Sequence, residues 1–251
     1  MEENLRLYLV GTAGSGKSTF TQALLEWMDD QKYPAFTVNL DPGAERLPYA
    51  PDVDVRDWVK LSDVMNHYSV GPNGGQILAA DMIALHAEEI RRDLDSLRAD
   101  YLIIDTPGQI ELFAFRESSR LLVEALGAPS MLTFLCDPLL ARQPAGYVSL
   151  ALLVQAVQFR FGLPSLTLLG KADLLKPEER ERIVSWSADT DLLQEALEGQ
   201  GVVSLELFKA LDSIGAFGAL VPVSGATGEG VADLYTAVQE IYMGGEDIVR
   251  E

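Results

Sequence analysis

Short runs of apolar residues alternate along the chain with longer stretches in which apolar residues recur at the spacing of an α-helix. The short runs predict buried strands at residues 5–10, 35–39, 100–106, 130–137, 166–169 and 220–223. The longer stretches predict helices at residues 17–30, 60–68, 76–97, 110–126, 147–161 and 230–243, with a further helical block at 177–217. Strands that alternate with helices and are apolar on both faces are typical of an α/β fold with a mainly parallel sheet flanked by helices.

Two segments depart from these patterns. Residues 41–56 contain Pro42, Pro48 and Pro51, which interrupt helices and central strands, so an irregular loop is predicted there. Residues 71–73 read Gly-Pro-Asn and predict a turn. Whether that turn only reverses the chain or presents Asn73 to a ligand depends on the other motifs.

The domain organisation follows from the absence of breaks in this alternation. No internal repeat, low-complexity tract or linker divides the sequence. We therefore expect a single domain over residues 1–251, in which residues 177–217 form a helical insertion before the last strand.

Composition narrows the class of protein. The 251 residues carry a net charge of −19, which argues against a surface for nucleic acid or for anionic lipid. The single cysteine, Cys136, lies in an apolar run and cannot form an internal disulfide, which favours a reducing compartment. The first residues lack the pattern of a signal peptide, and no apolar stretch reaches the roughly 18 residues of a membrane helix. A cytoplasmic protein is predicted.

The first chemical motif is GTAGSGKST at residues 11–19, which lies between a predicted strand and a predicted helix. It matches the phosphate-binding P-loop, G-x-x-x-x-G-K-[ST]. Its backbone amides and the helix N-terminus would surround phosphate, Lys17 would reach the β- and γ-phosphates, and Ser18 would ligate Mg²⁺. The predicted nucleotide contacts are Gly11, Thr12, Ala13, Gly14, Ser15, Gly16, Lys17, Ser18 and Thr19.

The second motif is LIIDTPGQ at residues 102–109. Asp105 ends a buried strand, where an unpaired acid is costly, so Mg²⁺ is its expected partner. The Gly108 amide is placed to contact a γ-phosphate, and Gln109 is placed to orient an attacking water.

The third motif, TLLGKADLL at residues 167–175, concerns the base. In GTPases the pattern [NT]-K-x-D provides a carboxylate that accepts from the two donors of guanine, and Asp173 fits that role while Lys171 lies along the base. The first position here is Gly170, which has no side chain. Downstream, Ser224, Gly225 and Ala226 follow a strand as a degenerate form of the S-A-K element of GTPases. These two segments favour guanine without settling it.

Together the motifs at residues 11–19, 71–73, 105–109 and 171–173 resemble the GPN-loop GTPase family, and the stretch VNLDPGAERLPYAPDVDVRD at residues 38–57 is similar to a characteristic segment of that family. The resemblance covers nearly the whole chain in the right order. The short chain without an extended tail further resembles the archaeal members, which have a single such protein.

The resemblance implies a P-loop NTPase that works as a homodimer. It implies that Asn73 of one subunit reaches toward the phosphates bound by the other, and that Asp41 positions the attacking water or joins the Mg²⁺ shell. Asp54, Arg56 and Asp57 are interpreted instead as structural ion pairs of their loop.

The helical block at residues 177–217 carries more apolar residues than a simple connection needs. It is interpreted as a cap on the core, with a groove for an apolar peptide as the alternative. Family members are associated with assembly of RNA polymerase and similar complexes, which implies a chaperone-like client protein.

The combined prediction is a Mg²⁺-dependent, homodimeric GTPase whose catalytic residues are Lys17, Asp41, Asn73 and Gln109 and whose metal ligands are Ser18, Asp41 and Asp105. Three alternatives remain. One is an ATPase of the partitioning type, although the loop lacks the extra lysine of that group. The others are a small-molecule kinase and a non-catalytic nucleotide-binding module.

Overall fold

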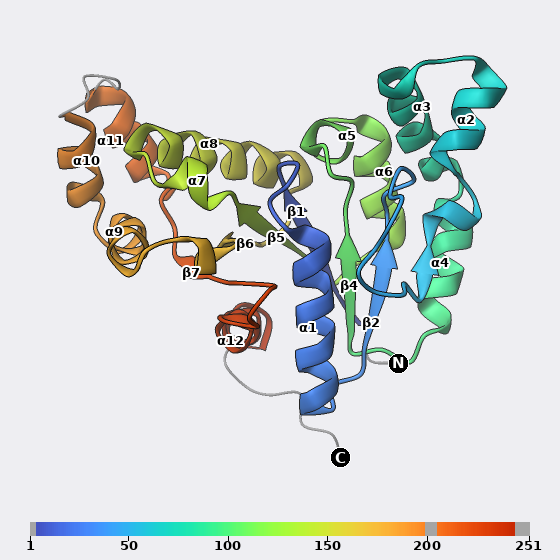
Figure 1. Cartoon of the computed structure of the whole chain (residues 1–251), viewed down its shortest axis with the longest axis horizontal. Coiled ribbons are helices and arrows are strands. Elements are labelled where there is room, and N and C mark those ends of the chain that lie inside the picture. The colour runs from blue at the N-terminus through green and yellow to red at the C-terminus, as the bar shows by residue number, and fades with distance from the viewer. Residues whose placement is uncertain (1–3, 199–204, 244–251) are drawn as a thin grey trace.

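A computed structural model describes residues 4–198 and 205–243. Within them the strands form one seven-stranded parallel sheet in the order β3-β2-β4-β1-β5-β6-β7 (Figure 1). The strands are β1 (Leu5–Gly11), β2 (Ala35–Asn39), β3 (Val53–Asp54), β4 (Tyr101–Asp105), β5 (Ser130–Cys136), β6 (Ser165–Leu169) and β7 (Leu220–Pro222). The predicted α/β class with a parallel sheet is confirmed.

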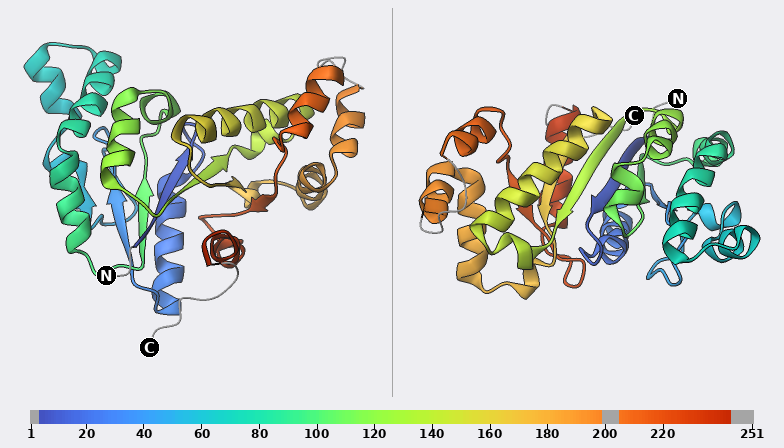
Figure 2. Two further views of the ribbon diagram at one scale, coloured as in Figure 1. Left: turned by 180° about the vertical axis from the view of Figure 1, so that it is seen from behind. Right: turned by 90° about the horizontal axis from the view of Figure 1, so that it is seen from above.

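Helices cover both faces of the sheet (Figure 2). On one face lie α1 (Lys17–Gln31) and α12 (Val231–Met243), which pack on a core that includes Leu7, Leu24 and Leu234. The other face carries α4 (Ala87–Ser96), α6 (Glu117–Leu126) and α8 (Pro144–Phe161) over a larger core. The other helices before the block at residues 177–217 are α2 (Leu61–Tyr68), α3 (Pro72–Leu85), α5 (Ile110–Ala114) and α7 (Pro138–Ala141). Strands β1 and β4 are buried along their whole length, which accounts for their mainly apolar sequences, interrupted by Arg6 in β1 and ended by Asp105 in β4.

The Gly-Pro-Asn segment differs from its prediction. Pro72 is the first residue of α3 and Gly71 is its N-cap, so Asn73 lies in the first turn of a helix rather than in a free turn. Proline is well suited to this position because its fixed φ matches the helix and its missing N–H is not needed there.

Two predicted helices are each divided in two. The helix expected at residues 76–97 is α3 followed by α4, with His86 between them. The helix expected at 110–126 is α5 followed by α6, and Arg116 at the junction has an extended backbone. The Arg116 guanidinium binds both carboxylate oxygens of Asp81 on α3, at 2.8 and 2.5 Å. The residue at the junction of α5 and α6 therefore links these helices to α3.

The block at residues 177–217 contains α9 (Pro177–Ala188), α10 (Thr190–Glu198) and α11 (Leu205–Ser213), while residues 199–204 lie outside the described part. Its buried side chains, including Ile183, Trp186, Leu193 and Phe217, belong to the same core cluster as the sheet. The division into one domain with an insertion stays a prediction. None of the described helices is long and apolar enough to cross a membrane.

Since all the strands are parallel, their carboxyl ends lie along one edge of the sheet, where ligands of such folds bind. The segments that follow β1, β2, β4, β6 and β7 all carry sequence motifs.

Candidate functional site

The P-loop joins β1 to α1, and its shape depends on glycine at three positions. Gly14 and Gly16 have φ of 76° and 98°, in the left-handed region that other residues rarely adopt. A Cβ at Gly11 would lie 2.6 Å from the Leu135 carbonyl oxygen on β5, which leaves no room for a side chain. The loop therefore turns tightly against β5 and opens into the N-terminus of α1.

Lys17 lies across this loop. Its side chain is buried, and Nζ donates to the carbonyl oxygens of Gly11 at 3.0 Å and Thr12 at 3.2 Å. Burial lowers the pKa of the Lys17 ammonium, while the nearby carboxylates of Asp105 and Asp41 act to raise it. The ammonium group is thus held beside the loop amides by backbone acceptors, in position to bind phosphate oxygens.

Asp105 is the last residue of β4, which is paired with β1. Its side chain is buried, and this burial raises the pKa of the carboxyl group to about 6. The Tyr49 hydroxyl donates to Oδ2 at 3.0 Å, whereas Oδ1 is buried and makes no hydrogen bond of ordinary geometry. The Ser18 hydroxyl lies near enough to lower the pKa of the same carboxyl. A buried carboxylate oxygen without a donor, next to a hydroxyl, is a suitable place for a cation.

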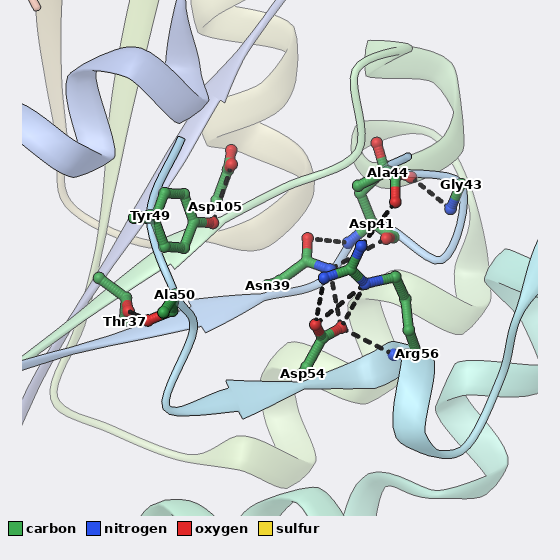
Figure 3. Close-up of polar contacts among 10 residues, drawn as sticks. All are labelled: Thr37, Asn39, Asp41, Gly43, Ala44, Tyr49, Ala50, Asp54, Arg56 and Asp105. Carbon is green, nitrogen blue, oxygen red and sulfur yellow. Dashed lines mark hydrogen bonds and ion pairs between the residues drawn. The ribbon is translucent and has the colours of Figure 1, made fainter. Parts of the chain in front are cut away.

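Asp41 joins two of the motif segments, and Figure 3 shows its contacts within the loop after β2. Its Oδ1 accepts from the Gly43 amide at 2.8 Å, and its Oδ2 accepts from the Gly108 amide at 3.3 Å. The carboxylate also contributes to the electrostatic field at Lys17 and Asp105. The structure thus brings together four predicted site residues, namely Lys17, Asp41, Asp105 and Gly108.

Two predicted site residues stand apart from this group. Gln109 is the exposed N-cap residue of α5, and Asn73 is exposed in the first turn of α3. Within the described residues, neither side chain hydrogen-bonds to Lys17, Asp41 or Asp105. Their proposed catalytic roles therefore need either movement of their segments or a second subunit.

The predicted metal ligands can be tested by their chemistry. No group of three or more His, Cys, Asp or Glu side chains in the described residues could hold a metal alone. The set of Ser18, Asp41 and Asp105 offers one hydroxyl and two carboxylates, which are the hard oxygen donors that Mg²⁺ prefers. Mg²⁺ also retains water and phosphate oxygens, so a small protein donor set fits it.

A pocket of about 230 Å³ adjoins the P-loop, and it brings the two base-recognition segments together. Its walls include Gly16 and Phe20 from one side, and Lys171, Asp173, Gly225 and Ala226 from the other. Apolar contacts from Phe20, Leu135 and Leu174 provide surfaces for a planar ring, while Asp173 is exposed to the pocket with a free carboxylate edge. Ser224 does not line the pocket; its Oγ accepts from the amides of Ala226 and Thr227, both at 3.2 Å, and so shapes the turn.

The two departures from the GTPase consensus have a steric cause. A Cβ at Gly170 would lie 3.1 Å from the Ser15 carbonyl oxygen, and one at Gly225 would lie 2.8 Å from the Phe20 amide nitrogen. Both segments pack directly against the P-loop or the first turn of α1. Lys171 Nζ donates to the Gly14 carbonyl at 2.5 Å and so fastens the 170–173 segment to the loop.

Sequence reasoning missed two residues of the site, Tyr49 and Asn39. Tyr49 lies between Pro48 and Pro51 in the loop after β2. Because proline restricts the backbone, these two residues indicated that the tyrosine side chain is held in a fixed position. Asn39 donates through Nδ2 to the Asp41 carbonyl at 3.1 Å and accepts from the Asp41 amide at 3.0 Å.

The predicted structural ion pair in this loop is confirmed for Asp54 and Arg56, whose charged groups are 2.5 Å apart, whereas Asp57 is exposed. The Arg56 guanidinium also donates to the Ala44 carbonyl at 2.7 Å, so the pair supports the turn that follows Asp41.

Comparison with known proteins agrees with this site. A family model described as "Conserved hypothetical ATP binding protein" matches residues 9–244. A GPN-loop GTPase of Pyrococcus abyssi is 33% identical, with 93% of this chain and 95% of that protein covered. GPN-loop GTPase 1 of Dictyostelium discoideum is 27% identical over 94% of this chain, but the match spans only 61% of that longer protein.

Among solved structures, the crystal structure of a Pyrococcus abyssi GTPase in its apo form superposes with a TM-score of 0.83. It is 31% identical and covers 95% of this chain and 97% of its own.

Proposed function

The chain belongs to the GPN-loop GTPase family, and from that premise we propose that it binds GTP and hydrolyses it to GDP and phosphate with the help of Mg²⁺. The observation that carries the proposal is the meeting of Lys17, Asp41 and Asp105 beside a P-loop that opens into the pocket with Asp173. Such a site offers positive charge and oxygen ligands on one side of the P-loop and a base carboxylate in the pocket that adjoins it.

The residues would divide the work as follows. Lys17 and the loop amides hold the phosphates and stabilise charge that develops during transfer. Ser18 and Asp105, with Asp41, would hold Mg²⁺, which would neutralise negative charge on the phosphates. The Gly108 amide donates to Asp41, and the same amide would donate to a bound γ-phosphate. Asp41 or Gln109 would orient the attacking water.

Guanine is favoured over adenine although the matching family model is described as ATP-binding. An exposed Asp173 carboxylate at the pocket edge can accept two hydrogen bonds from guanine, and adenine lacks that pair of donors. The close packing of Gly170 on the P-loop explains why this chain can dispense with a side chain at the position before Lys171.

The proposal includes a nucleotide-switched homodimer in the cytoplasm. Asn73 is exposed at the start of α3, with an amide that can both donate and accept, and it would reach the phosphates held by the partner subunit. A protein client, such as an apolar peptide of a complex like RNA polymerase, is proposed from the family resemblance. It is supported by exposed apolar residues in the helical block, among them Leu192 and Ile214.

The test compares turnover of GTP, ATP and XTP, with and without Mg²⁺, by the wild type and Asp173→Asn, with sedimentation of both. We expect the wild type to prefer GTP and the variant to shift toward XTP, because an amide presents a donor where the carboxylate accepted. Asp30→Asn, an exposed change on α1, is the matched control and should keep the GTP preference.

Equal use of ATP and GTP by both proteins would refute guanine recognition and favour the partitioning type of ATPase. Tight GTP binding without any turnover would favour the non-catalytic binding module. A monomer in every nucleotide state would refute the role proposed for Asn73 in the partner's site.

A further inference from the structure

Tyr49 makes a contact with the site that none of the sequence motifs assigns. Its ring is buried, and its hydroxyl donates to Oδ2 of Asp105 at 3.0 Å across 56 positions of sequence (Figure 3). The hydroxyl cannot act as an acid at ordinary pH, because burial and the neighbouring Asp105 carboxylate raise the pKa of Tyr49. Its effect on Asp105 is therefore that of a fixed hydrogen-bond donor.

The loop that carries Tyr49 is held on both sides. After Tyr49, Thr37 on β2 binds the returning chain: its amide donates to Asp52 Oδ2 at 2.8 Å, and its carbonyl accepts from the Asp52 amide at 2.9 Å. Before Tyr49, Arg56 holds the Ala44 carbonyl. Pro48 and Pro51 restrict the backbone on either side of the tyrosine.

The two oxygens of Asp105 are thereby made different. Oδ2 accepts from Tyr49, while Oδ1 is buried and has no well-formed hydrogen bond, with the Ser18 hydroxyl close to the carboxylate. Without the Tyr49 hydroxyl, the carboxylate would lose the donor that orients its terminal torsion, which is broad and roughly two-fold. A donor on one oxygen fixes this rotation and leaves the other oxygen as the one available to a cation.

We propose that Tyr49 is a positioning residue for the magnesium site, whose hydroxyl fixes the rotation of the Asp105 carboxylate so that Oδ1 is presented to the metal. This inference rests on the proposed GTPase function and adds to it a residue outside the phosphate-binding motifs. Outer partners of metal ligands commonly influence metal affinity in this way.

The experiment measures how much Mg²⁺ is needed to slow the release of a fluorescent GDP analogue from the full-length protein. For Tyr49→Phe we expect the Mg²⁺ concentration at half effect to rise about tenfold. Affinity for the nucleotide in EDTA should stay at the wild-type value, because Tyr49 has no place in the P-loop. Tyr147→Phe removes the hydroxyl of another buried tyrosine on α8 and is the matched control.

Two further variants separate positioning from general stability. In an Asp105→Asn background, adding Tyr49→Phe should cause no further rise in the Mg²⁺ requirement, because the carboxylate that the hydroxyl orients for the metal is already absent. Replacing Tyr49 by 4-aminophenylalanine keeps a hydrogen-bond donor on the ring and should restore most of the metal affinity. This variant still tests the role of the donor if Tyr49→Phe folds poorly. Thermal unfolding of each nucleotide-free protein checks that the fold is intact.

The outcomes distinguish the two claims. A wild type that binds no GDP analogue, or binds it without any influence of Mg²⁺, overturns the proposed function. A wild type with the expected Mg²⁺ dependence, together with a Tyr49→Phe variant whose requirement is unchanged or equal to that of Tyr147→Phe, overturns the positioning role alone.

Discussion

Replacing Asp105 by asparagine is expected to stabilise the nucleotide-free protein at neutral pH while removing one of the proposed magnesium ligands. The carboxylate is buried at the end of β4, and its only described hydrogen bond of ordinary geometry comes from Tyr49. An asparagine has nearly the same shape, and its amide oxygen can still accept from the Tyr49 hydroxyl. The substitution therefore removes a buried charge with little change in packing.

The magnitude follows from the raised pKa of the carboxyl group. A rise from 3.8 to about 6 is roughly two pKa units, and at 1.36 kcal/mol per unit the buried charge costs about 3 kcal/mol at neutral pH. That pKa already includes the attraction of Lys17, and the asparagine amide adds a buried donor that lowers the gain, so we expect a net increase of about 1 to 3 kcal/mol in the free energy of unfolding.

The pH dependence has a definite sign. Because the folded-state pKa is above the unfolded value, the contribution of Asp105 to stability is fully present below pH 3.8 and is lost as the pH rises through about 6. The asparagine variant has no such loss. Its advantage over the wild type should widen by about 1.4 kcal/mol between about pH 5 and pH 8.

Urea unfolding followed by tryptophan fluorescence measures this difference, and pH 5 keeps the protein above its isoelectric point of 4.4. Asp30→Asn, an exposed change on α1, is the control and should run parallel to the wild type. A constant gap between Asp105→Asn and the wild type across this range, or a variant that is less stable throughout, would refute the reasoning. Added Mg²⁺ and GDP should stabilise the wild type more than the variant.

Two further changes test the packing around the site. Gly225→Ala should lower the free energy of unfolding by about 1 to 3 kcal/mol in urea titrations, because its Cβ would meet backbone atoms of Thr19 and Phe20 at 2.8 to 2.9 Å. Gly218→Ala is the control, because a Cβ at Gly218 would enter open space. Equal urea midpoints for the two variants would contradict the close packing at Gly225. Burial raises the pKa of the Cys136 thiol to about 12, so alkylation should follow unfolding in urea, and rapid labelling of the native protein would show that the strand is not buried as described.

The sequence predicts the sheet and the phosphate site well because both depend on local chemistry. The apolar runs around Tyr8 and Ile103 allow only a buried strand, and the glycines at 14 and 16 allow the left-handed turn of the P-loop. Helix ends are harder, since the break at Arg116 depends on its contact with Asp81, 35 residues away.

The site residues that were missed have the same explanation. Tyr49 binds a carboxylate on a strand 56 positions later, and only the folded loop brings the two together. In the same way, Gly170 and Gly225 depart from the GTPase consensus for a reason that only the fold shows, because a Cβ at either position would lie close to backbone atoms of the P-loop or α1. Local pattern predicts which elements form, whereas contacts between distant segments decide how the site is completed.

The position of β1 in the sheet has a consequence for synthesis of the protein. β1 is made first, yet its two neighbours are β4 and β5, which end at residues 105 and 136. At ribosomal speeds of about 5 to 20 residues per second, the apolar strand waits roughly 6 to 25 s for both partners. Both edges of β1 are unpaired until β4 is made, and one edge stays unpaired until β5 follows, so the P-loop, which packs against Leu135, cannot take its final shape before then. We therefore expect chains interrupted before residue 136 to expose a segment prone to aggregation.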